Sequence, residues 1–128
     1  RTYCTPHPGE AATLLKSKTQ EIEADRIAAI HTLQQKFQGQ WVLKGSGSLI
    51  LEDQLYICTA GNPGMGTGGM GDVLAGMIAS LKAQLHENIH LHEVVTLHAL
   101  AGDELAKYGQ RGLKAQDMKQ AIYKVVNL

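Results

Sequence analysis

The chain has 128 residues, of which 44% are hydrophobic and 19% charged, and its net charge is zero. This composition is typical of one folded domain and excludes a disordered chain. Aromatic residues make up only 5% and no basic stripe accompanies them, so we expect no nucleic-acid partner. No apolar run reaches the roughly 20 residues of a membrane-spanning helix, so we expect no membrane partner. Cys4 and Cys58 match no metal or redox spacing, which indicates reduced thiols in the cytoplasm.

Strands and helices are predicted to alternate in the first half of the chain. A short strand ends at residues 3–5, and a helix follows over 9–16. A longer helix over about 20–36 has an apolar face that includes Ile22, Ile27, Ile30, Leu33 and Phe37. Strands are predicted at 41–43, 49–51 and 55–58, the last two joined as a β-hairpin by the polar turn 52–54.

The second half of the chain is predicted to be helical. Leu74, Met77 and Ile78 recur at helical spacing after Asp72, a second helix covers about 91–107, and a third begins near Asp117 and ends at about 126. Because strands come first and helices last, the pattern indicates an α/β layered domain and not a helix bundle.

Residues 61–72, GNPGMGTGGMGD, hold six of the 14 glycines. Glycine loses the most backbone freedom on folding, so this density indicates backbone that closely approaches an anion at a helix N-terminus. A Walker A loop needs Lys and then Ser or Thr after its last glycine, but Met70 and Gly71 follow Gly69. A Rossmann loop needs an acidic residue at the end of the next strand, and the nearest candidate, Glu87, ends a helix instead.

The end of this segment has the residues for phosphoryl transfer. The N–H groups of Gly69, Met70 and Gly71 could hold phosphoryl oxygens, and the Asp72 carboxylate could take a proton from an attacking hydroxyl. The structural alternative is that Asp72 only caps the helix that follows.

Two more polar segments follow predicted strands. KGSGS offers an ammonium, amides and hydroxyls to a phosphate, or forms an ordinary glycine turn; its residues are Lys44, Gly45, Ser46, Gly47 and Ser48. In TPHPGE (5–10), two prolines hold His7 in place beside Glu10, either to contact a substrate or as a structural turn with an exposed histidine.

The remaining candidates have weaker patterns. His86, His90 and His92 surround a connection between helices, and their neighbours favour a solvated loop over a metal site. Met65, Met70 and Met77 are interpreted as packing residues. We therefore predict no metal site built from protein side chains alone.

The order TPHPGE, KGSGS, GNPGMGTGGMGDVLAG, HALAGD (98–103) and GQRGL (109–113) resembles the ADP/ATP-dependent NAD(P)H-hydrate dehydratases. The resemblance runs from Thr5 to about Asn127. It implies a ribokinase-like α/β fold, with a mainly parallel sheet and helices on both faces. It further implies that residues 1–128 are the C-terminal part of a single dehydratase domain.

The resemblance also implies a reaction. In this family a nucleotide phosphorylates the hydroxyl on the hydrated nicotinamide ring of NADH or NADPH. Phosphate then leaves with help from the ring nitrogen, and the dihydronicotinamide is restored. The KGSGS form resembles the bacterial, ADP-using branch, and magnesium is implied with the nucleotide.

The same resemblance assigns roles to residues. Asp72 is expected to activate the substrate hydroxyl and contact the substrate, while Gly69, Met70 and Gly71 form the anion hole. Residues 44–48 are expected to bind the nucleotide, together with Gly71. His7 is expected to contact the hydrated cofactor.

Family members have a long stretch before TPHPGE that this chain lacks. We therefore expect a fragment with an exposed sheet edge, which favours a homo-oligomer. Two other functions stay open. One is a kinase of the same fold that acts on a thiazole or pyrimidine alcohol, and the other is a nucleotide-binding fragment without catalysis.

Overall fold

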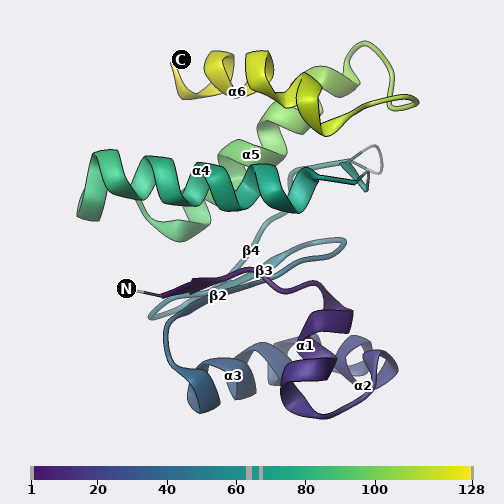
Figure 1. Cartoon of the computed structure of the whole chain (residues 1–128), viewed down its shortest axis with the longest axis vertical. Helices are drawn as coiled ribbons and strands as arrows, with labels where there is room; N and C mark the ends of the chain where they lie inside the picture. Colours follow the sequence, from purple (N-terminus) through teal and green to yellow (C-terminus); the bar gives the residue numbers. More distant parts are fainter. Residues whose placement is uncertain (1, 63–64, 67, 128) are drawn as a thin grey trace. The chain divides into compact units, whose positions relative to one another are not determined.

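The computed structural model describes residues 2–62, 65–66 and 68–127 (Figure 1). The chain divides into two compact units, Arg1–Thr59 and Ala60–Leu128. Each unit has its own layer of buried apolar side chains, and each is described by itself below.

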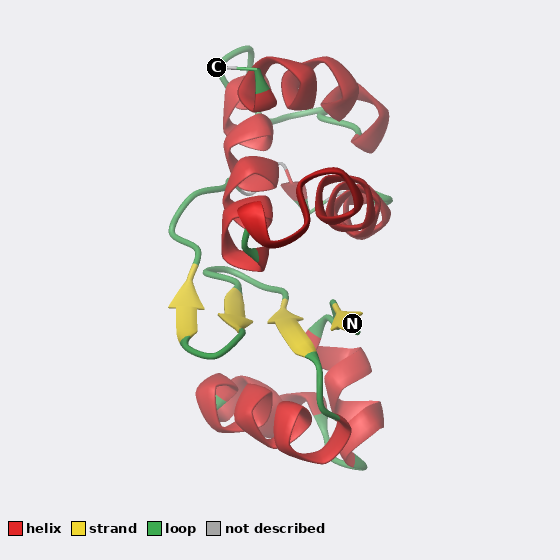
Figure 2. Ribbon diagram, turned by 90° about the vertical axis from the view of Figure 1, so that its left-hand side faces the viewer, coloured by secondary structure: helices red, strands yellow, loops and turns green. Residues whose placement is uncertain are grey.

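The first unit contains a four-stranded sheet (Figure 2). Its strands are β1 (Tyr3–Cys4), β2 (Gln40–Leu43), β3 (Leu49–Leu51) and β4 (Leu55–Ile57), and they lie in that order. β1 and β2 are parallel, whereas β2–β3 and β3–β4 are antiparallel. The predicted hairpin is thereby confirmed as β3–β4, with Leu51 opposite Leu55.

The pairing of these strands is more antiparallel than the family resemblance implied. Short connections join β2 to β3 and β3 to β4, and connections of that length reverse the chain direction. Only β1 and β2 are separated by helices, which give the chain enough length to return and pair in parallel.

Three helices cover one face of this sheet (Figure 1). They are α1 (Pro8–Leu15), α2 (Thr19–Ala24) and α3 (Arg26–Phe37). Alternate residues of β2 and β3 face these helices, as expected for strands. The resulting core consists of Ala11, Ala12, Ile22, Ala29, Ile30, Leu33, Trp41, Leu43, Leu49 and Leu51.

The single helix predicted over about 20–36 is wrong, because Asp25 divides it. Asp25 has φ −150° and ψ 82°, and its carboxylate accepts the Ala28 N–H at 3.0 Å. Aspartate competes in this way with the helical backbone, which favours it as a helix cap over an interior position. The break makes Arg26 the first residue of α3.

Two apolar residues of the predicted helix face are largely exposed. Ile27 is 49% and Phe37 43% exposed, whereas Ile30 is fully buried. At about 100° per residue, Ile27 lies roughly 110° from the centre of the stripe of Ala29, Ile30 and Leu33. Phe37 packs at the border of the core, with its ring centroid 6.0 Å from that of Trp41.

The second unit is helical, as predicted. It contains α4 (Met70–Leu85), η2 (His86–Asn88), α5 (Leu91–Ala106), η3 (Ala115–Asp117) and α6 (Met118–Val126). α5 packs against both α4 and α6. The buried residues of one core cluster are Met70, Ala101, Leu113, Met118, Ala121 and Val125. No helix in the described part of the chain is long and apolar enough to cross a membrane.

The difference between Ile30 and Ile27 can be tested on one helix. Ile30→Ala should lower the free energy of unfolding by about 2–4 kcal/mol, because it leaves a cavity in a closed core. Ile27→Ala is the matched control and should cost less than about 1 kcal/mol. Urea unfolding followed by circular dichroism measures both, and equal losses would contradict the burial described here.

Candidate functional site

The structure brings the segments TPHPGE and KGSGS together in the first unit. They follow β1 and β2, and the carboxyl ends of parallel strands lie at the same edge of a sheet. The backbone N–H of Lys44 donates to the Pro6 carbonyl at 3.0 Å. Two of the three segments singled out in the sequence are therefore in direct contact.

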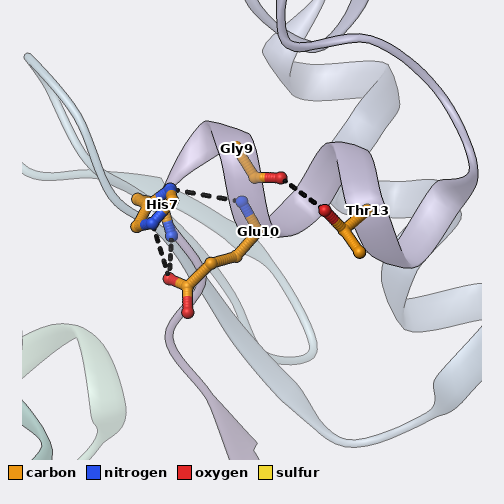
Figure 3. Close-up of polar contacts among 4 residues, drawn as sticks. All are labelled: His7, Gly9, Glu10 and Thr13. Carbon is orange, nitrogen blue, oxygen red and sulfur yellow. Dashed lines mark hydrogen bonds and ion pairs between the residues drawn. The ribbon is translucent and has the colours of Figure 1, made fainter.

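His7 caps the N-terminus of α1 (Figure 3). Its Nδ1 accepts the Glu10 N–H at 3.2 Å, and the Glu10 carboxylate accepts the His7 N–H at 3.0 Å. This capping box fixes the side chain, yet 60% of that side chain is exposed. The structural turn with an exposed histidine, one of the two alternatives for this segment, is thus present, and contact with a substrate stays a prediction.

Gly9 allows the imidazole to lie over the first turn of α1. A Cβ atom at Gly9 would be 2.9 Å from Cε1 and 3.1 Å from Nδ1 of His7, closer than such contacts allow. Thr13 Oγ1 donates to the Gly9 carbonyl at 3.2 Å (Figure 3). One helix cap therefore explains the order His-Pro-Gly-Glu. His7 accepts a hydrogen bond, Pro8 is the rigid first residue of the helix, and Gly9 leaves space for the imidazole. Glu10 accepts the reciprocal hydrogen bond through its carboxylate.

The capping box also changes the ionisation of Glu10. The His7 backbone N–H stabilises the carboxylate, so the pKa of Glu10 lies below its ordinary value. The nearby Lys44 charge lowers this pKa further. Glu10 therefore stays ionised to a lower pH than a free glutamate would.

Arg26 holds the KGSGS loop and was not foreseen from the sequence. Its guanidinium donates to the carbonyls of Leu43, Ser46 and Gly47 at 3.0–3.2 Å. Inside the loop, Ser48 Oγ lies 3.3 Å from both the N–H and the carbonyl of Gly45. Hydrogen bonds from Arg26 and Ser48 thus hold the loop in one conformation, although 17 or more positions separate Arg26 from its acceptors.

The glycine segment of the second unit leads into α4. Gly69 is the N-cap residue, and its backbone lies in the left-handed region at φ 88°. The first hydrogen bond of the helix runs from the Val73 N–H to the Gly69 carbonyl at 3.0 Å. The amides of Met70, Gly71 and Asp72 precede that bond and have no acceptor within the helix. This is the position that an anion hole requires; the anion hole itself stays a prediction.

Asp72 is not the cap of α4, so that structural alternative is wrong. It lies in the first turn, where the helix dipole favours a negative charge, and its side chain is exposed. Among the described residues, none donates a hydrogen bond to its carboxylate. The carboxylate is thus open to solvent beside the helix N-terminus.

Asp103, the last residue of the HALAGD motif, anchors the start of the glycine segment, a role that was not predicted from the sequence. Its carboxylate accepts the Gly61 N–H at 3.0 Å and the Asn62 side-chain amide at 2.8 Å. A Cβ on the adjacent Gly102 would lie 2.3 Å from the Met65 sulfur, so the segment lies close against α5. Pro63, Gly64 and Thr67 of the predicted motif lie outside the described residues.

The weaker candidates have structural roles. The rings of His90 and His92 stack with centroids 5.5 Å apart. Within the described ranges, no three His, Cys, Asp or Glu side chains are grouped to hold a metal ion. Met70 and Met77 are buried and Met65 packs on the helical core, which confirms them as packing residues.

The chain is similar to known proteins over nearly its whole length. The sequence profile of NAD(P)H-hydrate dehydratase matches residues 1–124. A bifunctional NAD(P)H-hydrate repair enzyme of Coxiella burnetii is 46% identical over 127 residues, which are 96% of this chain and 26% of that protein. An ADP-dependent (S)-NAD(P)H-hydrate dehydratase of Neisseria meningitidis is 44% identical over 82 residues, 62% of this chain and 28% of that protein.

Solved structures show the same fold. An ADP/ATP-dependent NAD(P)H-hydrate dehydratase of Bacillus subtilis, co-crystallized with ATP/Mg²⁺, aligns with TM-score 0.88 at 25% identity, over 98% of this chain and 48% of that one. A ribokinase-like superfamily protein of Enterococcus faecalis aligns with TM-score 0.81 at 33% identity, over 98% and 44%. The predicted ribokinase-like α/β fold is confirmed. The chain spans about a quarter of the curated relatives and about half of these structures.

The lowered pKa of Glu10 predicts a contribution to acid stability. Because the folded pKa lies below the ordinary one, the contribution is present above the ordinary pKa and is lost as the pH falls through the folded pKa. Glu10→Gln should therefore flatten the acid limb of a plot of unfolding free energy against pH. Urea unfolding at a series of pH values measures this. Glu23→Gln, at an exposed site on α2, should keep the wild-type slope.

Asp103 is expected to order the start of the glycine segment. Asp103→Ala should lower the free energy of unfolding by about 1–3 kcal/mol, because two donors lose their acceptor. It should also speed hydrogen exchange at the Gly61 amide. Asp103→Asn keeps one acceptor oxygen and should fall between wild type and alanine. Unchanged exchange at Gly61 in the alanine variant would contradict the anchoring role.

Proposed function

Because this chain belongs to the NAD(P)H-hydrate dehydratase family, we propose that it carries out nucleotide-dependent dehydration of hydrated NADH or NADPH, a cofactor repair reaction. The observation that carries the proposal is the start of α4. There, Gly69, Met70 and Gly71 precede an exposed carboxylate, that of Asp72, at the positive end of a helix.

In the first step, Asp72 takes the proton from the hydroxyl on the hydrated nicotinamide ring. The hydroxyl oxygen attacks the terminal phosphorus of the nucleotide, and the bond from that phosphorus to the bridging oxygen breaks. The amides of Gly69, Met70 and Gly71 hold the transferring oxygens, whose charge they stabilise without reorganising. Gly71 also contacts the nucleotide.

In the second step, the carbon–oxygen bond of the phosphorylated ring breaks. The lone pair of the ring nitrogen replaces the bonding pair, and phosphate leaves with that pair. A proton is then lost from the neighbouring ring carbon, which restores the double bond of the dihydronicotinamide. Phosphate leaves far more readily than hydroxide, which is why the dehydration consumes a nucleotide.

The nucleotide is assigned to the loop 44–48. Lys44 supplies a charge to the phosphate, and Gly45, Ser46, Gly47 and Ser48 supply amides and hydroxyls to the phosphate and ribose. The N. meningitidis relative is ADP-dependent by name, and we assign ADP as the donor here. Mg²⁺ is expected to come with the nucleotide, held by phosphate oxygens and water and by at most one or two carboxylates.

His7 is assigned to the hydrated cofactor. Its capped and exposed side chain supports this role, since a binding residue must be both fixed and accessible. We further assign residues 1–128 to the C-terminal part of a single dehydratase domain, a proposal supported by the single profile that spans residues 1–124. The cysteine spacing, which matches no metal or redox motif, supports a cytoplasmic location with reduced thiols, and a homo-oligomer remains our expectation.

The test is recovery of reduced cofactor by the purified protein. Hydrated NADH, Mg²⁺ and ADP or ATP are mixed with the protein, and the absorbance band of reduced nicotinamide is followed. Asp72→Asn should lower kcat by about 100- to 10,000-fold, because the base is lost while the shape is kept. Asp53→Asn removes an exposed carboxylate of the β3–β4 turn and should retain wild-type activity.

Two outcomes would overturn the dehydratase proposal. Phosphate transfer to a thiazole or pyrimidine alcohol, without recovery of reduced cofactor, would identify a kinase of the same fold. Nucleotide binding without either reaction would identify a non-catalytic fragment.

A further inference from the structure

We propose that Arg26 is a positioning residue that orients the backbone amides of the KGSGS loop toward the nucleotide. The inference rests on the proposed function in one respect, namely that residues 44–48 bind the nucleotide. It concerns a residue outside the five loop positions. Arg26 is the first residue of α3, directly after the N-cap residue Asp25.

The guanidinium binds the loop through carbonyl groups alone. Nη1 donates to Ser46 O at 3.0 Å and to Gly47 O at 3.2 Å, and Nη2 donates to Leu43 O at 3.2 Å. Nε is buried and has no partner among the described residues. All described hydrogen bonds of the guanidinium are therefore made to the main chain around one loop.

These three bonds fix the direction of three amide groups. In a trans peptide, the carbonyl of one residue and the N–H of the next point in opposite directions, and no described peptide is cis. The amides after Leu43, Ser46 and Gly47 belong to Lys44, Gly47 and Ser48, and they must point away from the guanidinium. The Lys44 amide donates to Pro6, as this geometry requires.

The remaining two amides, of Gly47 and Ser48, form the proposed contact with a phosphate. A cation behind the carbonyls polarises these peptides and makes their N–H groups better donors to an anion. Arg26 suits this role because its guanidinium is planar and presents several donors. It acts through the loop and needs no contact with the phosphate itself.

Two glycines of the loop match this arrangement. A Cβ at Gly45 would lie 2.9 Å from Nη2 of Arg26, so a side chain there would push against the guanidinium. Gly47 has φ 70°, in the left-handed region that glycine adopts without strain. The sequence KGSGS therefore has its glycines where the loop closes over Arg26 and where it turns.

The experiment measures ADP affinity by calorimetry for the wild-type protein and three variants. Arg26→Ala should raise the Kd for ADP by roughly 10- to 100-fold. Arg26→Lys keeps the charge without the fork of donors and should give a smaller increase. Free guanidinium ion should partly restore the affinity of Arg26→Ala. Lys36→Ala, an exposed cation on the same helix, is the control and should bind ADP as the wild type does.

A second readout separates positioning from general stability. The KM for the nucleotide should rise while kcat at saturating nucleotide changes little, and the thermal midpoint of Arg26→Lys should stay near that of the wild type. In amide NMR spectra, ADP should shift the Gly47 and Ser48 signals of the wild type more than those of Arg26→Ala.

The outcomes distinguish the inference from the function on which it rests. If the wild type binds neither ADP nor ATP, the proposed function fails. If the wild type binds ADP and folded Arg26→Ala binds it equally tightly, only the positioning inference is overturned. Unfolding of both Arg26 variants would make Arg26 a residue required for folding and would also overturn it.

Discussion

The parallel pairing of β1 with β2 determines where the chemistry of the first unit is gathered. Because the two strands run in the same direction, the segments that follow them begin at the same edge of the sheet. The bond from Lys44 N–H to the Pro6 carbonyl continues this pairing past the strand ends. The histidine cap of α1 and the KGSGS loop are neighbours for this reason, although three helices separate them in the chain. The antiparallel strand β3 begins at this edge and β4 ends there, since Leu49 lies opposite both Leu43 and Ile57. The Cys58 N–H donates to the Ser48 carbonyl at 2.8 Å.

Each glycine-rich segment is held by one charged side chain from a helix, and the two charges have opposite signs. Arg26 donates hydrogen bonds to carbonyl groups of the KGSGS loop. The Asp103 carboxylate instead accepts hydrogen bonds from the Gly61 N–H and from the side-chain amide of Asn62. Glycine lets the backbone turn sharply, but it supplies no side chain to hold the result. A loop that must present its main chain to a ligand therefore needs an anchor from elsewhere. Arg26 bonds through both Nη atoms and Asp103 through both carboxylate oxygens. Two hydrogen bonds from one side chain fix the orientation of the bound segment as well as its distance.

The segments of the site could be predicted from the sequence because their glycines and prolines act locally. The hairpin and the three late helices were predicted for the same reason, since alternation and helical spacing extend over few residues. The break at Asp25 was not predicted, because the apolar pattern continues across it while the aspartate side chain decides the backbone. The anchoring roles of Arg26 and Asp103 were not predicted, because their partners lie 17 to 42 positions away. No local pattern marks a side chain whose role is to bond the distant main chain.

The cap formed by His7 has a consequence for the direction of proton transfer. An imidazole nitrogen that accepts the Glu10 N–H must keep its lone pair, so Nδ1 is unprotonated and the proton of the neutral ring is on Nε2. The tautomer is thus set by a helix terminus, before any ligand is bound. In this state the N–H donor of the ring is on Nε2, 3.4 Å from a Glu10 carboxylate oxygen (Figure 3), and the ring has no free lone pair. It can recognise an acceptor such as a carboxamide oxygen or a phosphate, but it is unsuited to act as a base that competes with Asp72.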